Sequence, residues 1–273
     1  MSTRLRRAIL VVVLGTPLGG AAGPTPIWSD EFALAAGAGP DAARWVHDLG
    51  SGGWGNNELQ TYTAARENSF ITADPDALDG RALAIRAMRS PAGGYTSARL
   101  KSQGKFSLTY GRVEARMKLT RGRGVWPAFW MLGASIPTVG WPACGEIDIM
   151  EQVGHAPGKL HGTVHGPGYS GPKGISGTTE LAAGAALSDS YHVYAVDWSP
   201  KKITWSLDGR VYFVLTPSEL PAGTSWVFDA PMFLLLNLAV GGDWPGSPDA
   251  TTTFPQTLFV DYIRVYGPPA HCG

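Results

Sequence analysis

Hydrophobic and polar residues alternate in short runs along most of the chain. In residues 111–119 every second side chain is apolar and those between are charged, and residues 192–198 and 258–266 have a similar character. A period of two predicts strands with one face against a core. The longest helix-favouring stretch, residues 179–186, is short and contains Gly184. The pattern therefore predicts an all-β protein.

Turn-forming residues separate these runs. Asp208 and Gly209 stand between the strand-like residues 203–207 and 211–214, and an Asp-Gly pair in that position predicts a hairpin. Residues 234–236 lie in an apolar run that is too short to cross a membrane and predicts a buried strand.

The distribution of these strands also indicates how the chain is organised. Residues 25–267 show no internal repeat, linker or shift in composition. Many short strands at close spacing in one domain predict a jelly-roll β-sandwich of two antiparallel sheets.

Composition and charge narrow the class of protein. The 273 residues are 44% hydrophobic and 16% charged, with 36 Gly, 21 Pro and 10 Trp. Such a chain can build a large core, and its abundant tryptophans suit a surface that stacks flat ligands. The 22 basic and 22 acidic residues give a formal net charge of zero, which offers no electrostatic footprint for nucleic acid or an anionic membrane.

The N-terminus has the pattern of a secretory signal peptide. Arg4, Arg6 and Arg7 precede an apolar run at residues 8–14, and small residues follow to Ala22. We therefore expect a signal peptide over residues 1–22, one main folded domain over 23–267, a C-terminal tail over 268–273, and secretion. Export permits a disulfide between the two cysteines, Cys144 and Cys272, but the sequence does not decide whether they pair.

Three acidic residues within six positions carry the candidate chemistry. Glu146 and Asp148 share one face of a regular strand, whereas Glu151, five positions after Glu146, points to the opposite face. An unpaired carboxylate in the core is costly. One extra residue, a β-bulge near Ile149 or Met150, brings all three acids to the same side. The spacing therefore predicts a bulged strand whose acidic face lines a cleft.

This spacing suits a reaction that uses two carboxylates. With one residue absorbed by the bulge, the Cα atoms of Glu146 and Glu151 are about 13 Å apart, and the side chains can lean inward towards the ~5–5.5 Å separation of a retaining glycosidase. Asp148, which is shorter and lies between them, can hydrogen-bond Glu146. Three such close carboxylates cannot all stay ionised, so at least one pKa must rise, which produces a proton donor at neutral pH.

The chain also resembles a known family over most of its length. The acidic segment matches the bulged E-x-D-x-x-E signature of glycoside hydrolase family 16, and departs from the shorter E-x-D-x-E form of its lichenase-like members. The surrounding motifs resemble the laminarinase-like branch, which cleaves β-1,3-glucan. The motifs that carry the resemblance are Trp28–Phe32, Asn56–Tyr62, Val125–Leu132, Trp141–Gly145, Glu146–Glu151, Leu236–Gly242 and Val260–Tyr266.

The resemblance implies roles for the acids and for a concave sheet that forms an open substrate cleft. Glu146 is expected as the nucleophile, Glu151 as the general acid and then base, and Asp148 as the residue that tunes them. The expected function is endo-hydrolysis of internal β-1,3 bonds, and of β-1,4 bonds beside β-1,3 ones, by a monomer that binds β-glucan.

Aromatic and polar residues complete the expected site. Sugar faces pack on indole rings. Trp198 and Trp205, inside regular strands, are expected in the core. The expected substrate-binding residues are Trp126, Trp130, Trp141, Trp244, His165, Asn57, Glu58 and Asn237.

The family also implies a structural Ca²⁺ ion and no organic cofactor. Glu31 and Asp261 are the expected carboxylate ligands, with the backbone carbonyl of Gly80 completing the oxygen shell.

Three alternatives remain open from the sequence. The first is a glucan-binding protein that has lost catalysis, although all three acids are present. The second is a hydrolase of a sulfated galactan, for which Arg121 and Arg123, just before Trp126, could supply positive charge. The third is transglycosylation, which shares the covalent intermediate and differs in the acceptor.

Overall fold

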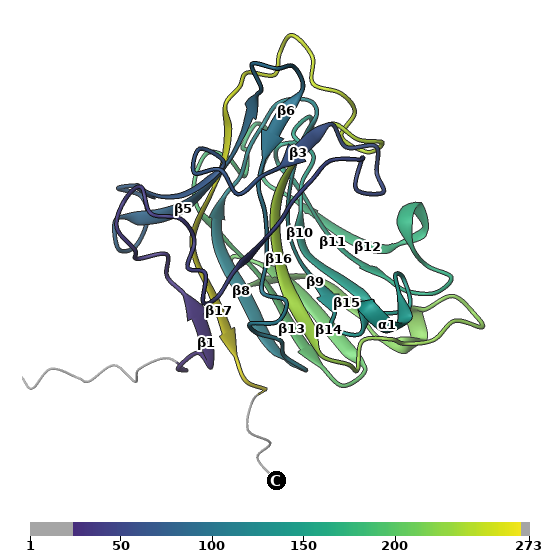
Figure 1. Cartoon of the computed structure of the whole chain (residues 1–273). Coiled ribbons are helices and arrows are strands. Elements are labelled where there is room, and N and C mark those ends of the chain that lie inside the picture. Colours follow the sequence, from purple (N-terminus) through teal and green to yellow (C-terminus); the bar gives the residue numbers. More distant parts are fainter. Residues whose placement is uncertain (1–23, 269–273) are drawn as a thin grey trace, which may run out of the picture.

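Two β-sheets pack face to face and enclose the core. The computed structural model describes residues 24–268, and Figure 1 shows the strands in two curved layers. Over the described residues one sheet has ten strands and the other has seven. The predicted signal peptide, Cys272 and residues 269–273 of the predicted tail lie outside these residues.

The ten-stranded sheet follows the order β15-β14-β13-β8-β17-β5-β6-β3, with β1 beside β17 and β4 beside β5. Its strands are β1 (Trp28–Asp30), β3 (Gln60–Tyr62), β4 (Ser69–Ala73), β5 (Arg81–Arg89), β6 (Tyr95–Ser97), β8 (Gly111–Lys118), β13 (His192–Ser199), β14 (Lys202–Leu207), β15 (Arg210–Leu215) and β17 (Gln256–Tyr266).

The seven-stranded sheet follows the order β12-β11-β10-β9-β16-β7-β2. Its strands are β2 (Val46–Asp48), β7 (Arg99–Lys101), β9 (Val125–Gly133), β10 (Glu146–Glu151), β11 (Lys159–His165), β12 (Ile175–Glu180) and β16 (Met232–Val240). The helical elements are α1 (Ile136–Val139), η1 (Gly171–Lys173) and η2 (Pro217–Glu219).

The alternation read from the sequence produces this architecture. Strands β8, β13 and β17 cover the three runs with a period of two, and their apolar positions form much of the core. Asp208 and Gly209, with φ of 49° and 77°, join β14 to β15. Positive φ at both positions is what a tight hairpin turn of matching twist requires. The predicted hairpin and the all-β sandwich are therefore confirmed.

Burial and strand direction refine two of the expectations. All nine residues of β16 are buried, as the apolar run predicted, and the predicted core residues Trp198 and Trp205 are also buried. The sheets are not wholly antiparallel, because β3 and β6 pair in parallel. No helix among residues 24–268 is long and apolar enough to cross a membrane.

Candidate active site

A β-bulge in β10 places the acids on one face of the sheet. Asp148 pairs with Trp130 of β9, but the next pair is Met150 with Phe129, so β10 contains one more residue than β9 over this interval. The register with β11 shifts in the same interval. The extra residue is Ile149, which is buried. The bulge predicted near Ile149 or Met150 is confirmed, and it turns Glu151 towards the side of Glu146 and Asp148.

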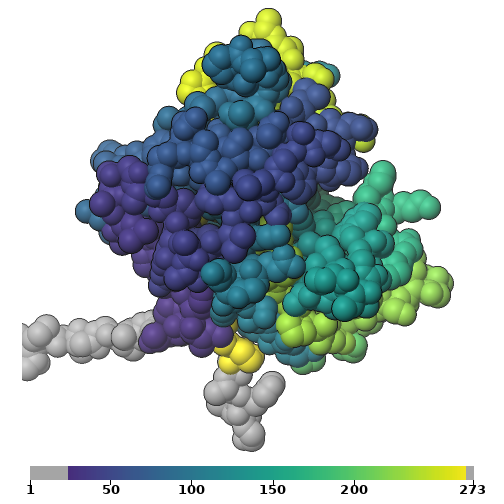
Figure 2. Space-filling model, in the orientation of Figure 1, coloured from purple at the N-terminus to yellow at the C-terminus, as the bar shows by residue number. Residues whose placement is uncertain are grey.

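The three acids line a large cleft on the seven-stranded sheet. Its volume is about 990 Å³, and its walls include side chains from β7, β9, β10, β11, β12 and β16. In Figure 2 a depression separates the blue N-terminal part of the chain from the teal segment that contains α1. The cleft therefore crosses several strands, and the three acids lie near the middle strand of the sheet.

Each glutamate accepts a hydrogen bond from a tryptophan on the cleft wall. The indole N–H of Trp141 donates to Glu146 Oε2 at 2.9 Å. The indole N–H of Trp126 donates to Glu151 Oε1 at 3.1 Å, and the hydroxyl of Thr163 donates to Glu151 Oε2 at 3.4 Å. These donors hold the two carboxyl groups in place at the cleft surface and favour their ionised forms.

His165 lies beside the first two acids. Its Nε2 atom is 3.3 Å from Asp148 Oδ2 and 3.8 Å from Glu146 Oε1. One side-chain atom of each of these three residues lies within 4.8 Å of the other two. The imidazole therefore contacts the pair formed by Glu146 and Asp148, and its expected role in binding substrate stays a prediction.

Burial makes all three carboxyl groups hard to ionise. Burial, together with the nearby Asp148 carboxylate, raises the pKa of Glu146 to about 8, although His165 and the Trp141 N–H act in the opposite direction. Burial likewise raises the pKa of Asp148. It also raises the pKa of Glu151 well above its ordinary value, with the charges of Asp148 and Glu146 adding to the effect. Glu151 is therefore suited to retain its proton near neutral pH.

The opposite sheet supports the bulged strand from behind. Trp205 of β14 is fully buried, and its indole N–H donates across the core to the backbone oxygen of Asp148 at 2.8 Å. A Cβ atom at Gly162 of β11 would lie 2.4 Å from the Trp205 ring. The close packing of this ring leaves no room for a side chain at that position.

Most of the expected substrate-binding residues line the cleft. Those that do are Trp126, Trp130, Trp141, Trp244, His165, Glu58 and Asn237. Trp141 and Trp244 are also among the most exposed large apolar residues of the described chain, at 48% and 40%. Exposed indoles at a cleft of this kind are suited to stacking against sugar rings.

Asn57 is the exception. It is not among the residues that line the cleft, and its amide donates to the carboxylate of Asp243 at 3.0 and 3.1 Å. The neighbouring Asn56 and Asp243 itself line the cleft instead. Asn57 has a φ of 55°, so the turn directs its side chain differently from a regular strand.

Several cleft residues were not predicted from the sequence. They are Trp54, Asn56, Arg99, His161, Thr163, Ser176 and Asp243. For His161 and Thr163 a signal was available, because they alternate with the predicted His165 along β11 and therefore share its face. Arg99 and Trp54 reach the cleft through β7 and a loop far from the acids in sequence, so local pattern did not indicate them.

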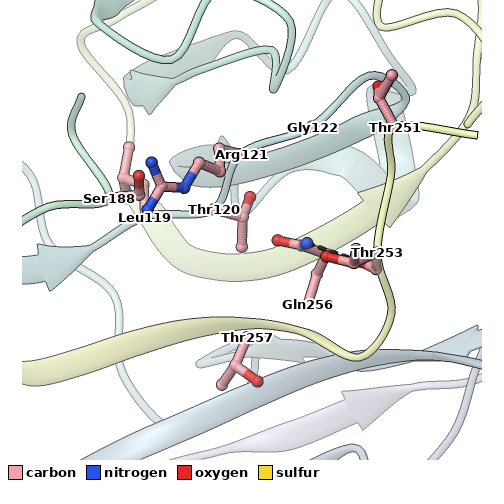
Figure 3. A pocket seen from close by; sticks show the side chains of 9 residues that line it. All are labelled: Leu119, Thr120, Arg121, Gly122, Ser188, Thr251, Thr253, Gln256 and Thr257. Atoms are coloured by element: carbon pink, nitrogen blue, oxygen red, sulfur yellow. Dashed lines mark hydrogen bonds between the residues drawn. The ribbon is translucent and has the colours of Figure 1, made fainter. Parts of the chain in front are cut away.

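The positive charge in the cleft comes from Arg99 and not from the arginines before Trp126. Arg99 Nε is 3.1 Å from a carboxylate oxygen of Asp48, and its guanidinium lies over the rings of Trp54 and Trp130. Arg121 lines a separate hollow of about 430 Å³ with hydroxyl and amide side chains, shown in Figure 3, and Arg123 is absent from the cleft lining. The two arginines proposed for a sulfated substrate therefore do not lie in the cleft.

The residues expected to bind Ca²⁺ already have other partners. The carboxylate of Glu31 forms hydrogen bonds with Arg264, and that of Asp261 accepts from Arg116 and from the backbone N–H of Leu78. The carbonyl of Gly80 accepts from Asp74 N–H at 3.1 Å. A calcium ion needs six to eight oxygen ligands, and here two of the three donors are occupied by cationic side chains. The calcium site remains a prediction that these contacts do not support.

Together, the sandwich fold and a cleft with two glutamates, a third acid and flanking indoles define a glycoside hydrolase. Comparisons with known proteins agree. The model of glycosyl hydrolases family 16 matches residues 56–264, and the chain belongs to that family.

The similarity extends over most of the chain. A beta-glucanase from Rhodothermus marinus is 43% identical over 253 residues, which cover 88% of this chain and 84% of that protein. The endo-beta-1,3-glucanase structure from Pyrococcus furiosus is 47% identical, with a TM-score of 0.80 and coverage of 89% and 94%. The laminarinase catalytic domain from Thermotoga maritima is 44% identical, with a TM-score of 0.78 and coverage of 89% and 98%. Two further curated relatives are longer, and the chain spans 40% and 33% of their lengths.

Proposed function

We propose that this chain is a retaining endo-β-1,3-glucanase that cleaves internal glycosidic bonds. The observation that carries the proposal is the bulge at Ile149, which brings Glu146, Asp148 and Glu151 to one cleft wall. The names of its relatives support the substrate, because they describe beta-glucanases, endo-beta-1,3-glucanases and laminarinases.

Glu146 is the proposed nucleophile. Its ionised carboxylate attacks the anomeric carbon, a C–O bond to Glu146 forms, and the glycosidic C–O bond breaks. The Trp141 N–H and the nearby His165 favour this ionised form against the effect of burial. A carboxyl group with a raised pKa needs such partners in order to react as a nucleophile near neutral pH.

Glu151 is the proposed general acid and base. In the first step its proton passes to the oxygen of the leaving sugar. In the second step its carboxylate removes a proton from water, which attacks the anomeric carbon and releases Glu146. Burial and the neighbouring carboxylates raise its pKa well above the ordinary value, and this suits the residue that begins the cycle protonated.

Asp148 is proposed to couple the two glutamates. It lies between them on β10 and close to both Glu146 and His165. Its charge raises the pKa of each glutamate, so a proton bound at one acid changes the affinity of the others for protons. When the glycosyl-enzyme forms, the negative charge of Glu146 is lost, and this favours the ionised form of Glu151 after its proton has passed to the leaving sugar.

The indoles on the cleft walls are proposed to bind successive glucose units. Trp141 donates a hydrogen bond to Glu146 and Trp130 pairs with Asp148, while Trp126 contacts Glu151 and packs edge-on against Trp244. Such rings bind the apolar C–H faces of sugars without requiring a charged substrate. This arrangement agrees with a neutral glucan and with binding in the middle of a chain.

Glu146→Gln tests the proposal. Glutamine keeps the size of the side chain but cannot act as a nucleophile, so release of reducing sugar from laminarin should fall by at least about a thousandfold. Glu67→Gln, at an exposed glutamate away from the cleft, should leave the rate unchanged. Laminarin hydrolysis at the native rate by Glu146→Gln would refute the assignment of the nucleophile.

The same experiment separates the alternatives. A glucan-binding protein without catalysis would bind laminarin and release no sugar before or after the substitution. A product profile on laminarin, lichenan, agarose and carrageenan tests the galactan alternative, which is weakened because the cleft arginine, Arg99, is already paired with Asp48. We expect the fastest cleavage with laminarin and slower cleavage of the mixed linkages in lichenan.

A further inference from the structure

A chain of hydrogen bonds links three residues of the cleft wall through one buried tyrosine, Tyr62. The indole N–H of Trp130 donates to Asn237 Oδ1 at 2.8 Å, and the Asn237 Nδ2 amide donates to the Tyr62 hydroxyl at 3.1 Å. The Tyr62 hydroxyl donates to Glu58 Oε2 at 3.3 Å. Three of these residues, Trp130, Asn237 and Glu58, line the cleft, whereas Tyr62 does not.

The chemistry of the two ends fixes the direction of this chain. An indole nitrogen can only donate a hydrogen bond, and an ionised carboxylate can only accept one. Asn237 must therefore direct its oxygen towards Trp130 and its nitrogen towards Tyr62, and Tyr62 must direct its hydrogen towards Glu58. The order of donors sets the orientation of the Asn237 amide without ambiguity between its oxygen and nitrogen.

The surroundings of Tyr62 show what it can and cannot contact. It is 1% exposed, so it cannot touch a substrate in the cleft. Its ring packs against Trp54 at a centroid distance of 5.3 Å, and Arg99 lies over both Trp54 and Trp130 at 4.9 and 4.7 Å. The Glu58 oxygen that accepts from Tyr62 also accepts a hydrogen bond from the Gln60 amide at 2.6 Å, which helps to fix its position.

We infer that Tyr62 is a positioning residue for sugar binding: its hydroxyl holds the Asn237 amide, and through it the Trp130 indole, in the orientation presented to the substrate. Asn237 Nδ2 carries a second hydrogen that the chain does not use, so a fixed amide has one donor left for a sugar oxygen. Linked hydrogen bonds polarise one another, and deleting the central link weakens the neighbouring ones. The kinetic consequence rests on the proposed function, but the geometry of Trp130 does not.

Tyr62→Phe tests this inference because it removes the hydroxyl alone. We expect KM for laminari-oligosaccharides to rise by about fivefold to tenfold, which corresponds to the loss of one or two hydrogen bonds. The value of kcat should change by less than about twofold, because binding in the ground state and in the transition state is weakened alike. A general loss of folded protein would lower the active fraction and leave KM unchanged.

A second readout does not depend on activity. The indole N–H resonance of Trp130, assigned in ¹⁵N-labelled protein with Trp130→Phe, should move in Tyr62→Phe. The indole resonances of Trp126 and Trp141, which donate to the catalytic glutamates, should stay in place. If native protein fails to cleave β-1,3-glucan while the Trp130 resonance still moves, the proposed function is wrong and the positioning role stands.

A matched control is available in the same molecule. Tyr194 is also fully buried, and among the described residues its hydroxyl has no hydrogen-bond partner. Tyr194→Phe should therefore change neither KM nor the Trp130 resonance. If Tyr62→Phe does not fold, Asn237→Asp breaks the same link from the other side, because aspartate can accept from Trp130 but cannot donate to Tyr62.

The outcomes are decisive in both directions. A raised KM with a shifted Trp130 resonance in Tyr62→Phe, with neither change in Tyr194→Phe, supports the inference. An unchanged KM and an unmoved Trp130 resonance, in whichever of the two variants folds, would overturn it. Equal effects in Tyr62→Phe and Tyr194→Phe would also overturn it, because they would show that the loss of any buried hydroxyl is sufficient.

Discussion

Glu146 and Glu151 lie on the same cleft wall although five positions separate them on one strand. Side chains five positions apart on a regular strand point to opposite faces, so their common orientation depends on the extra residue Ile149. Whether Glu146 and Glu151 share a face thus depends on how many residues lie between them in β10, and changing that number tests the dependence.

Inserting one alanine between Ile149 and Met150 should abolish activity and destabilise the fold. The insertion adds a second unpaired residue and reverses the alternation, so either Glu151 turns into the core or the residues after it change faces, and burying an unpaired carboxylate is costly. We expect the free energy of unfolding to decrease by at least about 2 kcal/mol, measured by urea denaturation. Ile149→Val keeps the residue count and should cost only about 1 kcal/mol with activity retained. Full activity in the insertion variant would contradict the role of the bulge.

The effect of Glu151→Gln should depend on the leaving group. Without a proton donor, hydrolysis of laminarin should slow by about 10²–10⁴-fold, because the sugar oxygen departs unprotonated. An aryl glycoside with an acidic phenol needs little protonation, so formation of the glycosyl-enzyme from it should be much less affected. Measuring both substrates by steady-state and burst kinetics checks this, and an equal loss on both would argue against Glu151 as the acid.

The two tryptophan donors should control opposite limbs of the pH–rate profile. Removing a hydrogen bond to an ionised carboxylate raises its pKa. Trp141→Phe removes the donor to Glu146, which must be ionised to react, so the acidic limb of kcat/KM should move to higher pH by about half a unit to one unit. Trp126→Phe removes the donor to Glu151, which must be protonated, so the alkaline limb should move upward instead.

These two variants serve as controls for each other. Each replaces an indole by a smaller aromatic ring on the cleft wall. A general loss of sugar stacking should therefore lower the maximum kcat/KM of both variants without moving either limb. A shift of the same limb in both variants would show that the hydrogen bonds do not set the two ionisations separately.

The raised pKa of Glu146 predicts how stability changes with pH. Burial raises this pKa to about 8 from the ordinary value of 4.5, so over that interval the folded chain retains a proton that the unfolded chain releases. The resulting stabilisation is complete below about pH 4.5 and is lost as the pH rises through about 8. Between these limits the native free energy of unfolding should fall by about 1–3 kcal/mol more than that of Glu146→Gln.

Urea unfolding at about pH 5, 6.5 and 8 measures this difference. Glu67→Gln, at an exposed position, should follow the native curve at every pH. Parallel curves for native protein and Glu146→Gln would show that Glu146 titrates alike in the folded and unfolded chains.

The sequence predicted the parts of this protein that depend on local pattern. Alternation in residues 111–119 and the Asp208–Gly209 turn are local, and both appear in the structure as expected. The bulge at Ile149 could be predicted because leaving Glu151 in the core would be costly. The position of the acidic strand and the face that carries its acids therefore follow from local pattern alone, without any long-range contact.

The remaining features depend on contacts between distant segments. Arg99 reaches the cleft only because β7 pairs with β16, and the parallel pairing of β3 with β6 has no local signal. Asn57 was misplaced because its backbone adopts a positive φ and its side chain turns to Asp243, 186 positions away. Pattern along the chain does not specify which of two adjacent asparagines a turn directs into a cleft.

The bond from the Trp205 indole to the Asp148 carbonyl has a consequence for heat inactivation. This bond fastens the reactive strand to the opposite layer of the sandwich through the middle of the core. We therefore expect that the strand carrying the catalytic acids does not unfold locally before the rest of the sandwich unfolds. Catalysis and near-ultraviolet circular dichroism should decline along a single melting curve, so this enzyme should keep full turnover until the two layers separate.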